Sequence, residues 1–555
     1  MFRHVVLLLL LSLSFGKIFG QKVDSTSLDS TKRYIQIIYA KKAKYGKGKD
    51  SAAQKLIGEV KLKHNEVILT CDSAYFYQRT NSIKAFSNVR LNQADTLFLT
   101  GNRINYSGET KIAEVIGNVK LEDPTTYLEC KHLYFYREQN KGSYYTGGRL
   151  FSKGSPDTLS STQATYYSED KIAIFRKNVV LKNPEYVMET DTMKYSTEIK
   201  QSYFYGPTTI TSDSNTIYCN AGWYNTETNK SSFYNRAIIS SPEQKLEGDS
   251  LYYDRNTGLG KAFGNIVITD TINNFMVTGE RAFSYNEGDS SIIPSRPLLY
   301  HFMGKDTLLV SSDTVYTKQV NDSNKQVFAF HNVLFHKSDV QGKCDTIIFD
   351  ERFQRLDMID SPILWSDKNQ ITGDKISLFV KEEVIDRLFI PKNAFIGEQV
   401  DGEIFNQIKG KNLTAFFKDG DIYKVEIRGN GESIYHALEE GVDSLGKAIN
   451  ILAGVNQAIC SDMDIRMQDS EITEINFITS PKSTLHPPTK ILDEKLVLKN
   501  FTWHGEVRPE SKKVVKARGN RVIKFNDPIV SPQIPLIIPQ EKAQEETEEN
   551  KKGEQ

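Results

Sequence analysis

Three aspartates that share one position of a repeated phrase are the residues of this sequence best suited to chemistry. Asp313, Asp345 and Asp374 each follow a small residue and precede Thr or Lys. If equivalent segments stack on one another, carboxylates in line could hold a cation or act as the acid–base pair of a glycoside hydrolase. The other interpretation is structural, because an Asp in this setting commonly accepts a hydrogen bond from its own backbone.

Other signatures of catalysis or of ligand binding are weak. The nine histidines are scattered, without HExxH spacing or a cluster of ligands. The stretch RGNGES, from Arg428 to Ser433, resembles a phosphate loop but opens no helix of a βαβ unit. With 70 basic and 70 acidic residues, the chain lacks the basic domain typical of nucleic-acid-binding proteins. We therefore predict no enzyme activity, no cofactor, no metal and no nucleic-acid partner. A carbohydrate-active β-helix enzyme that uses the acidic positions is the alternative.

A short phrase recurs along the chain and predicts the elements that hold these residues. In GNVKL and its variants, Val60, Val89, Val119 and Val179 lie 29, 30 and 60 residues apart. Gly and Asn tolerate positive φ, so they mark a corner where one strand bends into the next. A fixed period near 30 residues indicates the coils of a stacked β structure, because no single coil can bury its apolar face alone. The aromatic, Thr-rich and Val-rich composition also favours an all-β fold.

A second phrase, between copies of the first, carries an aromatic column. It appears as CDSAYFY from Cys71 and CKHLYFY from Cys130. The aromatic column, spaced by 29 to 31 residues, consists of Phe76, Tyr106, Phe135, Tyr166, Tyr195, Tyr224 and Tyr253. Cysteines 71, 130, 219 and 344 occupy the small-residue position of this phrase. Positions two coils apart are about 9 to 10 Å apart, which favours a packing role over a disulfide or a zinc site.

Apolar residues alternate with polar ones in the first phrase and predict an apolar wall on one face of the stack. Besides the aromatic column, the candidate residues of this wall are Val60, Leu62, Val89, Leu91, Val119, Leu121, Val179, Leu181, Ile266, Ile268, Val333 and Phe335. Two interpretations stay open. The wall is the dry core of a structural β-solenoid, such as a scaffold or an adhesin, or it lines a groove for acyl chains in a folded sheet that is left slightly open.

The two ends of the chain are predicted to lie outside the repeat. Residues 1–20 combine a basic start, an apolar run from Val5 to Leu13 and a final small residue. This order is typical of a secretory signal peptide, whereas a membrane span needs ~20 apolar residues. Residues 21–33 are expected to form a flexible N-terminal segment. Residues 510–555, which contain the proline-rich DPIVSPQIPLIIPQ and a charged end, are expected to form a disordered tail.

The signal peptide, the IGNVKL phrases and the TCDSAYFY-type strands together resemble the OstA/LptA-like proteins of Gram-negative envelopes. The resemblance implies a repetitive β-jellyroll, also called a β-taco, over residues 34–434. Residues 435–509 are similar to the closing section of the long OstA-like variants. LptD, the outer-membrane member of this system, has a large β-barrel after its jellyroll. Since about 120 residues follow the repeats here, we expect no membrane barrel.

This resemblance also implies a function in lipopolysaccharide transport. It leads us to expect an exported protein of the periplasm, with or without association with the outer membrane. Its ligand would be lipopolysaccharide or a related glycolipid, and it would serve outer-membrane assembly. The open ends of a stacked sheet expose unpaired strand edges. We therefore expect partners among other jellyroll transport proteins by edge-strand pairing, or head-to-tail self-association.

Overall fold

The computed structural model describes most of the repeat. The described residues are 34–45, 53–272, 274–285, 289–321, 324–381, 384–402, 404–418, 421–442, 448–468, 471–488 and 497–519. The predicted signal peptide, the segment 21–33 and residues 520–555 lie outside them. No helix within these ranges has both the length and the apolar character needed to cross a membrane.

The chain divides into two compact units. Unit 1 comprises Met1–Pro124 and Glu129–Asn140, and unit 2 comprises Thr125–Leu128 and Lys141–Gln555. The strands of unit 1 are β1 (Gln36–Tyr39), β2 (Lys42–Tyr45), β3 (Gln54–His64), β4 (Val67–Tyr77), β5 (Ser82–Gln93), β6 (Leu97–Ser107), β7 (Ile112–Glu122) and most of β8 (Thr126–Tyr136).

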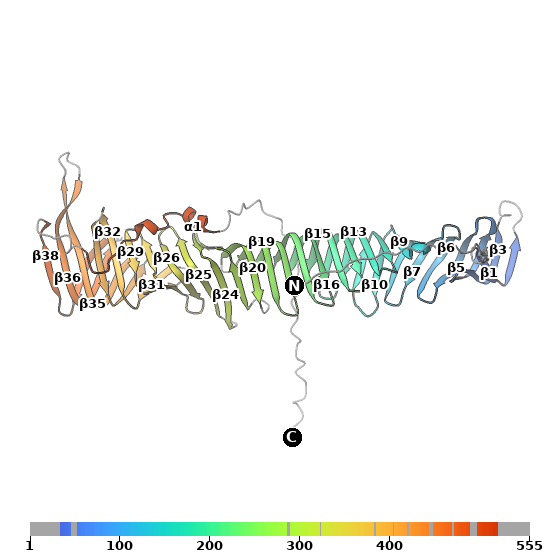
Figure 1. Ribbon diagram of the computed structural model, residues 1–555, viewed down its shortest axis with the longest axis horizontal. Coiled ribbons are helices and arrows are strands. Elements are labelled where there is room, and N and C mark those ends of the chain that lie inside the picture. The colour runs from blue at the N-terminus through green and yellow to red at the C-terminus, as the bar shows by residue number, and fades with distance from the viewer. Residues whose placement is uncertain are drawn as a thin grey trace, which may run out of the picture. The chain divides into compact units, whose positions relative to one another are not determined.

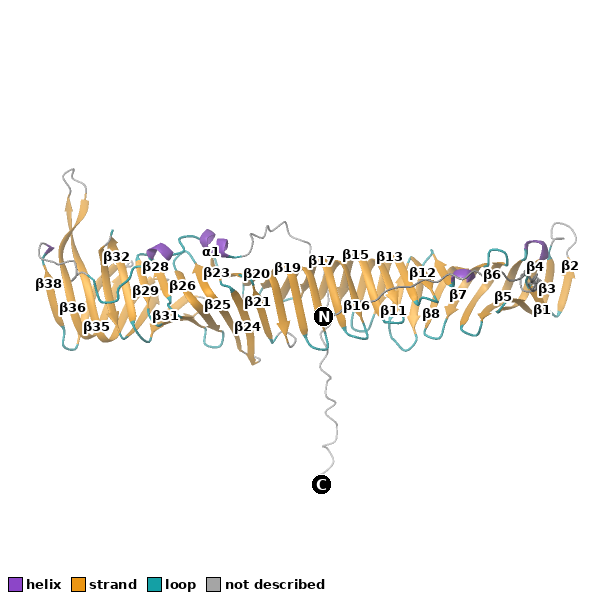
Figure 2. Cartoon of the chain, in the orientation of Figure 1, coloured by secondary structure: helices purple, strands orange, loops and turns teal. Residues whose placement is uncertain are grey.

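Unit 2 continues the same pattern over a longer stretch. Its first strands are β9 (Lys141–Tyr144), β10 (Gly148–Ser152), β11 (Thr158–Ser161), β12 (Gln163–Tyr167), β13 (Ile172–Lys182), β14 (Val187–Ser196), β15 (Gln201–Thr211), β16 (Thr216–Asn225), β17 (Lys230–Ser240), β18 (Gln244–Asp254), β19 (Leu259–Asp270), β20 (Phe275–Tyr285), β21 (Ser290–Pro294), β22 (Leu298–Met303), β23 (Asp306–Ser311) and β24 (Thr314–Asn321). The later ones are β25 (Asn324–His336), β26 (Gln341–Asp350), β27 (Arg355–Ile359), β28 (Ile363–Ser366), β29 (Asn369–Thr372), β30 (Lys375–Lys381), β31 (Val384–Ile390), β32 (Ala394–Asp401), β33 (Ile404–Gly410), β34 (Asn412–Lys418), β35 (Asp421–Val442), β36 (Ala448–Gln468), β37 (Glu471–Ile478) and β38 (Lys482–His486). The ribbon is almost entirely strand (Figure 1, Figure 2).

The corner predicted at Gly-Asn is present, but it lies inside a strand and not between two strands. In β7, Gly117 and Asn118 have φ values of 76° and 49°, and the antiparallel register with β6 shifts there. In β19, Gly264 and Asn265 repeat this geometry with φ values of 72° and 47°. Such a β-bulge bends and twists a strand without ending it. Each long strand therefore supplies one segment to each of two facing layers.

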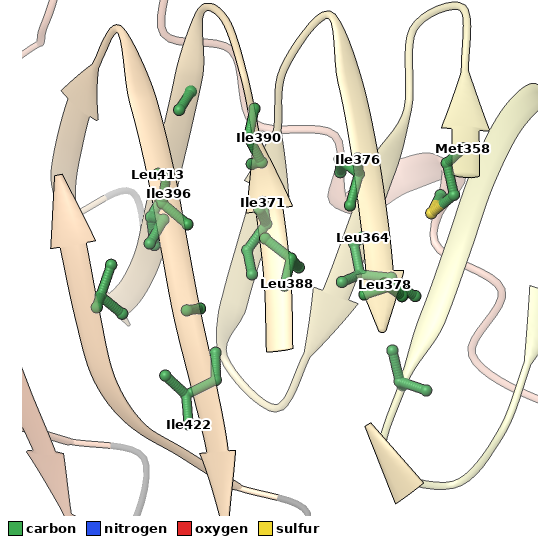
Figure 3. Close-up of a cluster of buried hydrophobic side chains, with 14 of the residues drawn as sticks. Met358, Leu364, Ile371, Ile376, Leu378, Leu388, Ile390, Ile396, Leu413 and Ile422 are labelled. Atoms are coloured by element: carbon green, nitrogen blue, oxygen red, sulfur yellow. The ribbon is translucent and has the colours of Figure 1, made fainter. Parts of the chain in front are cut away.

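The apolar core lies between these two layers. In Figure 3, Met358, Ile376 and Leu388 point inward from neighbouring strands of unit 2. All three side chains are fully buried. The predicted all-β, repetitive jellyroll fold is thus confirmed, since antiparallel neighbours bury one apolar face in each coil.

The repeat continues past Ile434, where the sequence had suggested that a closing section begins. Ile434 lies within β35, which pairs antiparallel with β36 over nearly its whole length. Strand β36 in turn pairs with β37 and with β38. Residues 435–442, 448–468 and 471–486 are therefore further parts of the same sheet.

A C-terminal segment, residues 497–519, crosses the outer face of unit 2, and we call it the strap. At one end Leu498 packs with Ile434 and Val455. At the other end lies α1 (Lys512–Arg518), whose fully buried Val515 packs on Leu298, Leu309 and Leu334. Leu308 and Val310, on either side of Leu309, pack on the inner core, so Leu309 and the strap lie on the opposite face of the strand.

Polar side chains hold the strap between its two apolar ends. Gln407 Oε1 accepts the Leu498 N–H at 2.8 Å. Gln370 accepts the His504 N–H at 2.7 Å and donates to the Thr502 carbonyl at 2.8 Å. Gln341 accepts two bonds from the Arg508 guanidinium, at 2.6 and 2.9 Å.

The predicted disordered tail is wrong for residues 512–518, which form α1. Lys512 Nζ lies 2.7 Å from Asp306 Oδ1. Burial would raise the pKa of Asp306, but hydrogen bonds from Lys512 and Ser338 outweigh it and lower that pKa far below its usual value. The charged composition gave no sign of this helix, because a single apolar side chain and a single ion pair hold it against the sheet.

Candidate functional site

The structure places the predicted wall in the interior of both units. Of the 19 candidate side chains, 15 are less than 9% exposed: Val60, Leu62, Val89, Leu91, Val119, Leu121, Val179, Ile266, Val333, Phe335, Phe76, Tyr106, Phe135, Tyr166 and Tyr224. The remaining four, Leu181, Ile268, Tyr195 and Tyr253, are partly exposed. The wall is therefore packed at every candidate position of unit 1, and the four positions that solvent can reach all lie in unit 2.

The aromatic column closes unit 1 along the seam between its two layers. Successive turns alternate between two rims: the β3–β4 turn lies on rim A and the β6–β7 turn on rim B. Tyr106, near rim B, has its hydroxyl 2.7 Å from Nδ1 of His64 on rim A. Burial raises the pKa of Tyr106, and hydrogen bonding to Arg137 partly opposes this. The tyrosine therefore spans the mouth of the folded sheet as a neutral hydrogen-bonding bridge.

Unit 2 is bridged in the same way over its first strands. Tyr224, at the rim B end of β16, meets Tyr186 of rim A edge-on, with ring centroids 6.2 Å apart. Beside them, Arg255 of rim B pairs with Glu185 of rim A at 3.2 Å. Burial raises the pKa of Tyr195, which also hydrogen-bonds to Ser152 across the seam.

Beyond Tyr253 the aromatic column is interrupted until Phe349. The cross-strand row that contains Tyr253 continues through Gly260, Ser284, Ser291 and Thr317. These side chains are too short to span the mouth as a tyrosine does. The seam of unit 2 therefore loses its bridging rings over β19 to β24.

The apolar wall becomes reachable where the column stops. The row that runs through Ile210 and Ile217, each 3% exposed, continues across the next strands. Beyond Ile239, which is 9% exposed, the next members of the row are partly exposed, and we call them the open strip: Leu246, Ile268, Val277, Leu299 and Val310. Five strands at the usual separation give an apolar strip about 19 Å long.

A small cavity lies nearer the C-terminal end of unit 2. Its lining combines apolar Ile396, Ile408 and Ile465 with polar Asn369, Asn406 and Glu398. Asn369 and Asn406 are buried, so these amides belong to the packed interior.

Sequence reasoning found Ile268 but missed Val277, Leu299 and Val310. Leu299 and Val310 lie on strands of six residues, and the first phrase is not recognisable around any of the three. The available signal was in the second phrase, whose aromatic position becomes Ser284 in GERAFS and Thr317 in SDTVYT.

The acidic column supports the bulges. Asp313 accepts the side-chain amide of Asn332 at 2.7 Å, and Asp374 accepts that of Asn393 at 2.8 Å. Asp345 lies 3.1 Å from His331 Nδ1, which occupies the bulge of β25. We expected each Asp to bond its own backbone, but these contacts reach side chains at the bulge of a neighbouring strand. In the part of the chain that the structure describes, no group of three or more His, Cys, Asp or Glu residues is placed to hold a metal ion.

All five cysteines are free, and four of them are buried. Desolvation raises the pKa of Cys71 to about 11 and that of Cys219 to about 12, so these thiols are protonated at neutral pH. At the same position in another coil, a Cβ added to Gly101 would lie 2.5 Å from Val115. The position demands a small side chain because an apolar residue of the neighbouring strand packs over it.

Comparisons with known proteins identify two sequence families along the chain. Residues 32–191 and 176–249 match a family described as OstA-like protein. Residues 303–384 match the family LptA/(LptD N-terminal domain) LPS transport protein. A search of curated proteins found no match. Among solved structures, the chain is similar to LptH of Pseudomonas aeruginosa, the LptA-homologous periplasmic component of its lipopolysaccharide transport device. The identity is 16% over 26% of this chain and 80% of LptH, with a TM-score of 0.14.

Proposed function

The chain belongs to the OstA/LptA-like family, and we propose that it is a periplasmic component of lipopolysaccharide transport that shields acyl chains against its inner wall. The observation that carries this proposal is the open strip, an apolar row that leaves the packed interior of unit 2 and becomes reachable where the aromatic column stops.

The energetics of transfer explain what the strip would provide. Each CH₂ group exposed to water costs ~0.8 kcal/mol, so a 14-carbon acyl chain costs on the order of 10 kcal/mol. A glycolipid therefore needs apolar cover to cross an aqueous compartment. Equivalent rungs offer equivalent burial, so displacement along the wall changes the free energy little, and no chemical step is required.

The sequence is also compatible with two other functions. A structural scaffold or adhesin with a dry core fits the 15 packed positions of the wall, but it gives no reason for an apolar strip to stay open to water. A carbohydrate-active enzyme would use the acidic column, whose carboxylates instead hold the amides of Asn332 and Asn393. We therefore favour lipid binding over both.

Each unit has a strand edge that suits pairing with other jellyroll proteins. In unit 1, all four residues of β1 are exposed, among them Ile38 at 49%. In unit 2, β38 exposes Leu485 at 64%. Unpaired edges with apolar side chains favour the addition of a further strand, so we propose a jellyroll partner or a second copy of this chain at these edges. Service in outer-membrane assembly follows from the same proposal.

Site-specific photocrosslinking in living cells tests lipid binding directly. A benzophenone amino acid is placed at Val277 or at Leu299, both on the open strip. We expect a lipopolysaccharide adduct at both positions, because an acyl chain on the strip would contact them.

The matched control is Thr269, which is also partly exposed but points to the other face of β19 from Ile268. We expect no adduct there. Equal labelling at Thr269, or no lipid adduct at Val277 and Leu299 in a folded protein, would contradict the proposal and favour the dry-core scaffold.

A further inference from the structure

An exposed aromatic face covers the outer side of strands β15 to β20, opposite the buried wall. Tyr205, Tyr234 and Phe263 are 50%, 39% and 38% exposed. Each lies next in sequence to a side chain that is less than 9% exposed, Phe204, Phe233 and Ala262 respectively, so the rings point away from the core. The aromatic face is defined by Tyr205, Trp223, Tyr234, Tyr252, Phe263 and Phe283.

The rings of this face are regularly spaced. In cross-strand register, Tyr205 and Tyr234 both pair with Ala221, and Tyr234 and Phe263 both pair with Ser250. One aromatic ring therefore stands on every second strand, about 9.6 Å from the next, with a small residue between. This arrangement leaves shallow gaps between flat rings, which suits a ligand that is itself a repeating polymer.

Trp223, Tyr252, Lys261 and Phe283 form a second row, parallel to the first, and their side chains contact one another or the rings of the first row. Trp223 donates its indole N–H to the hydroxyl of Tyr234 at 3.2 Å, which fixes the two rings relative to each other. Lys261 lies over the ring of Tyr252, 5.5 Å from its centroid. Phe263 and Phe283 meet edge-on at 6.0 Å.

The chemistry of this face matches a saccharide chain. The negative face of an aromatic ring attracts the weakly positive C–H groups of a sugar ring, while tyrosine hydroxyls can exchange hydrogen bonds with sugar hydroxyls. Lys261 and Arg281 pair directly with Phe283 and Phe263, while the nearby carboxylate of Asp249 is held by the Asn265 side chain. Both residues paired with the rings are basic, which favours a saccharide that carries phosphate or carboxylate groups.

We propose that the aromatic face binds the anionic saccharide chain of a glycolipid. The inference rests on the proposed function only for the source of that saccharide, because the face itself is formed without the open strip. Strands β18 to β20 carry both sites, with the open strip on the inner face of one layer and the aromatic face on the outer face of the other, so lipid tails and sugars of one molecule would be held by the same strands.

Binding of lipid-free saccharide tests this inference. The probe is the core and O-chain saccharide released from lipopolysaccharide by mild acid, added to the full-length protein. Trp223 is one of three tryptophans and points outward on the face, whereas Trp365 is fully buried. We expect saturable quenching of tryptophan fluorescence, and an affinity at least tenfold lower after Tyr234→Ala together with Phe263→Ala.

Tyr423→Ala is the matched control, since Tyr423 is a 47% exposed aromatic residue on β35, away from this face. Its affinity should equal that of the unchanged protein. Equal saccharide binding by the Tyr234→Ala/Phe263→Ala variant would overturn the proposal. So would the absence of saccharide binding, including the case in which a benzophenone placed at Tyr234 crosslinks to a protein and not to saccharide. Because the probe has no acyl chain, these outcomes are independent of crosslinking at Val277.

Discussion

At the scale of single residues, each rung is held in shape by the bulge and by the polar column opposite it. Asn265 adopts positive φ and donates its side-chain amide to Asp249 at 2.7 Å. Asn88 and Asp72 make the same bond at 2.8 Å in unit 1. Asn serves two purposes at this position, because it tolerates the left-handed backbone and also supplies a donor.

These two purposes can be separated by substitution at Asn265. Asn265→Gly keeps the backbone conformation but loses the hydrogen bond, so we expect a cost of about 1 kcal/mol. Asn265→Ala also strains the left-handed backbone and should cost about 2 to 3 kcal/mol. The measurement is the urea midpoint followed by circular dichroism.

Asp249→Asn serves as the control, because an amide oxygen can still accept the bond from Asn265. We expect a smaller loss than with Asn265→Gly. If Asn265→Ala were no more destabilising than Asn265→Gly, positive φ at the bulge would not be a significant source of strain.

At the scale of elements, the strap is the feature that ties together segments far apart in sequence. Arg508 reaches Gln341, 167 residues earlier, and Lys512 reaches Asp306, 206 residues earlier. The strap crosses strands that are already paired, so it contributes side-chain packing and hydrogen bonds to the rungs beneath it.

The docking of α1 depends on one apolar side chain, and its neighbour provides a matched comparison. Val515 is fully buried, whereas Val514 is 44% exposed. Val515→Asp loses the burial of a valine, about 1.5 to 3 kcal/mol, and places a charge against Leu309. We expect amide hydrogen exchange over residues 512–518 to become at least tenfold faster, with the exchange of β22 and β25 nearly unchanged.

Val514→Asp should leave that exchange within about twofold, because an exposed valine contributes little burial. Similar acceleration in both variants would mean that helix propensity holds α1 in place, and not the contact of Val515 with the sheet.

The sequence predicted the rungs well and the strap poorly, for a physical reason. Val119 and Leu121 alternate with polar residues, and Gly117 and Asn118 mark the bulge, so each coil is encoded locally. Val515 belongs to a pair of valines between lysines, and its partners Leu298, Leu309 and Leu334 lie some 200 positions earlier. A packing contact between residues so far apart produces no repeating pattern in the sequence. The open strip was predicted only at Ile268, and the remaining signal was the replacement of the aromatic residue by Ser284 and Thr317.

At the scale of the whole molecule, the residue at the aromatic-column position of each coil determines whether the seam between the two layers is closed or open. Each unit is bridged where a tyrosine spans its seam, as Tyr106 does in unit 1 and Tyr224 does in unit 2. Where Ser284 and Thr317 take that position, the wall is reachable at Val277 and Leu299. The chain thereby combines a stable packed interior with a site at which an apolar ligand can enter.

Restoring the column should close that entry. Ser284 pairs with Gly260 on one side and with Ser291 on the other, so a larger ring at this position has room between small neighbours. We expect Ser284→Tyr to cover the open strip and to reduce the lipopolysaccharide adduct from a benzophenone at Val277 at least tenfold. Ser284→Thr, which adds one methyl group and cannot span the seam, should leave the adduct within about twofold of the unchanged protein. An undiminished adduct in the folded Ser284→Tyr variant would show that lipid reaches Val277 by another route, and that the aromatic column does not control access to the wall.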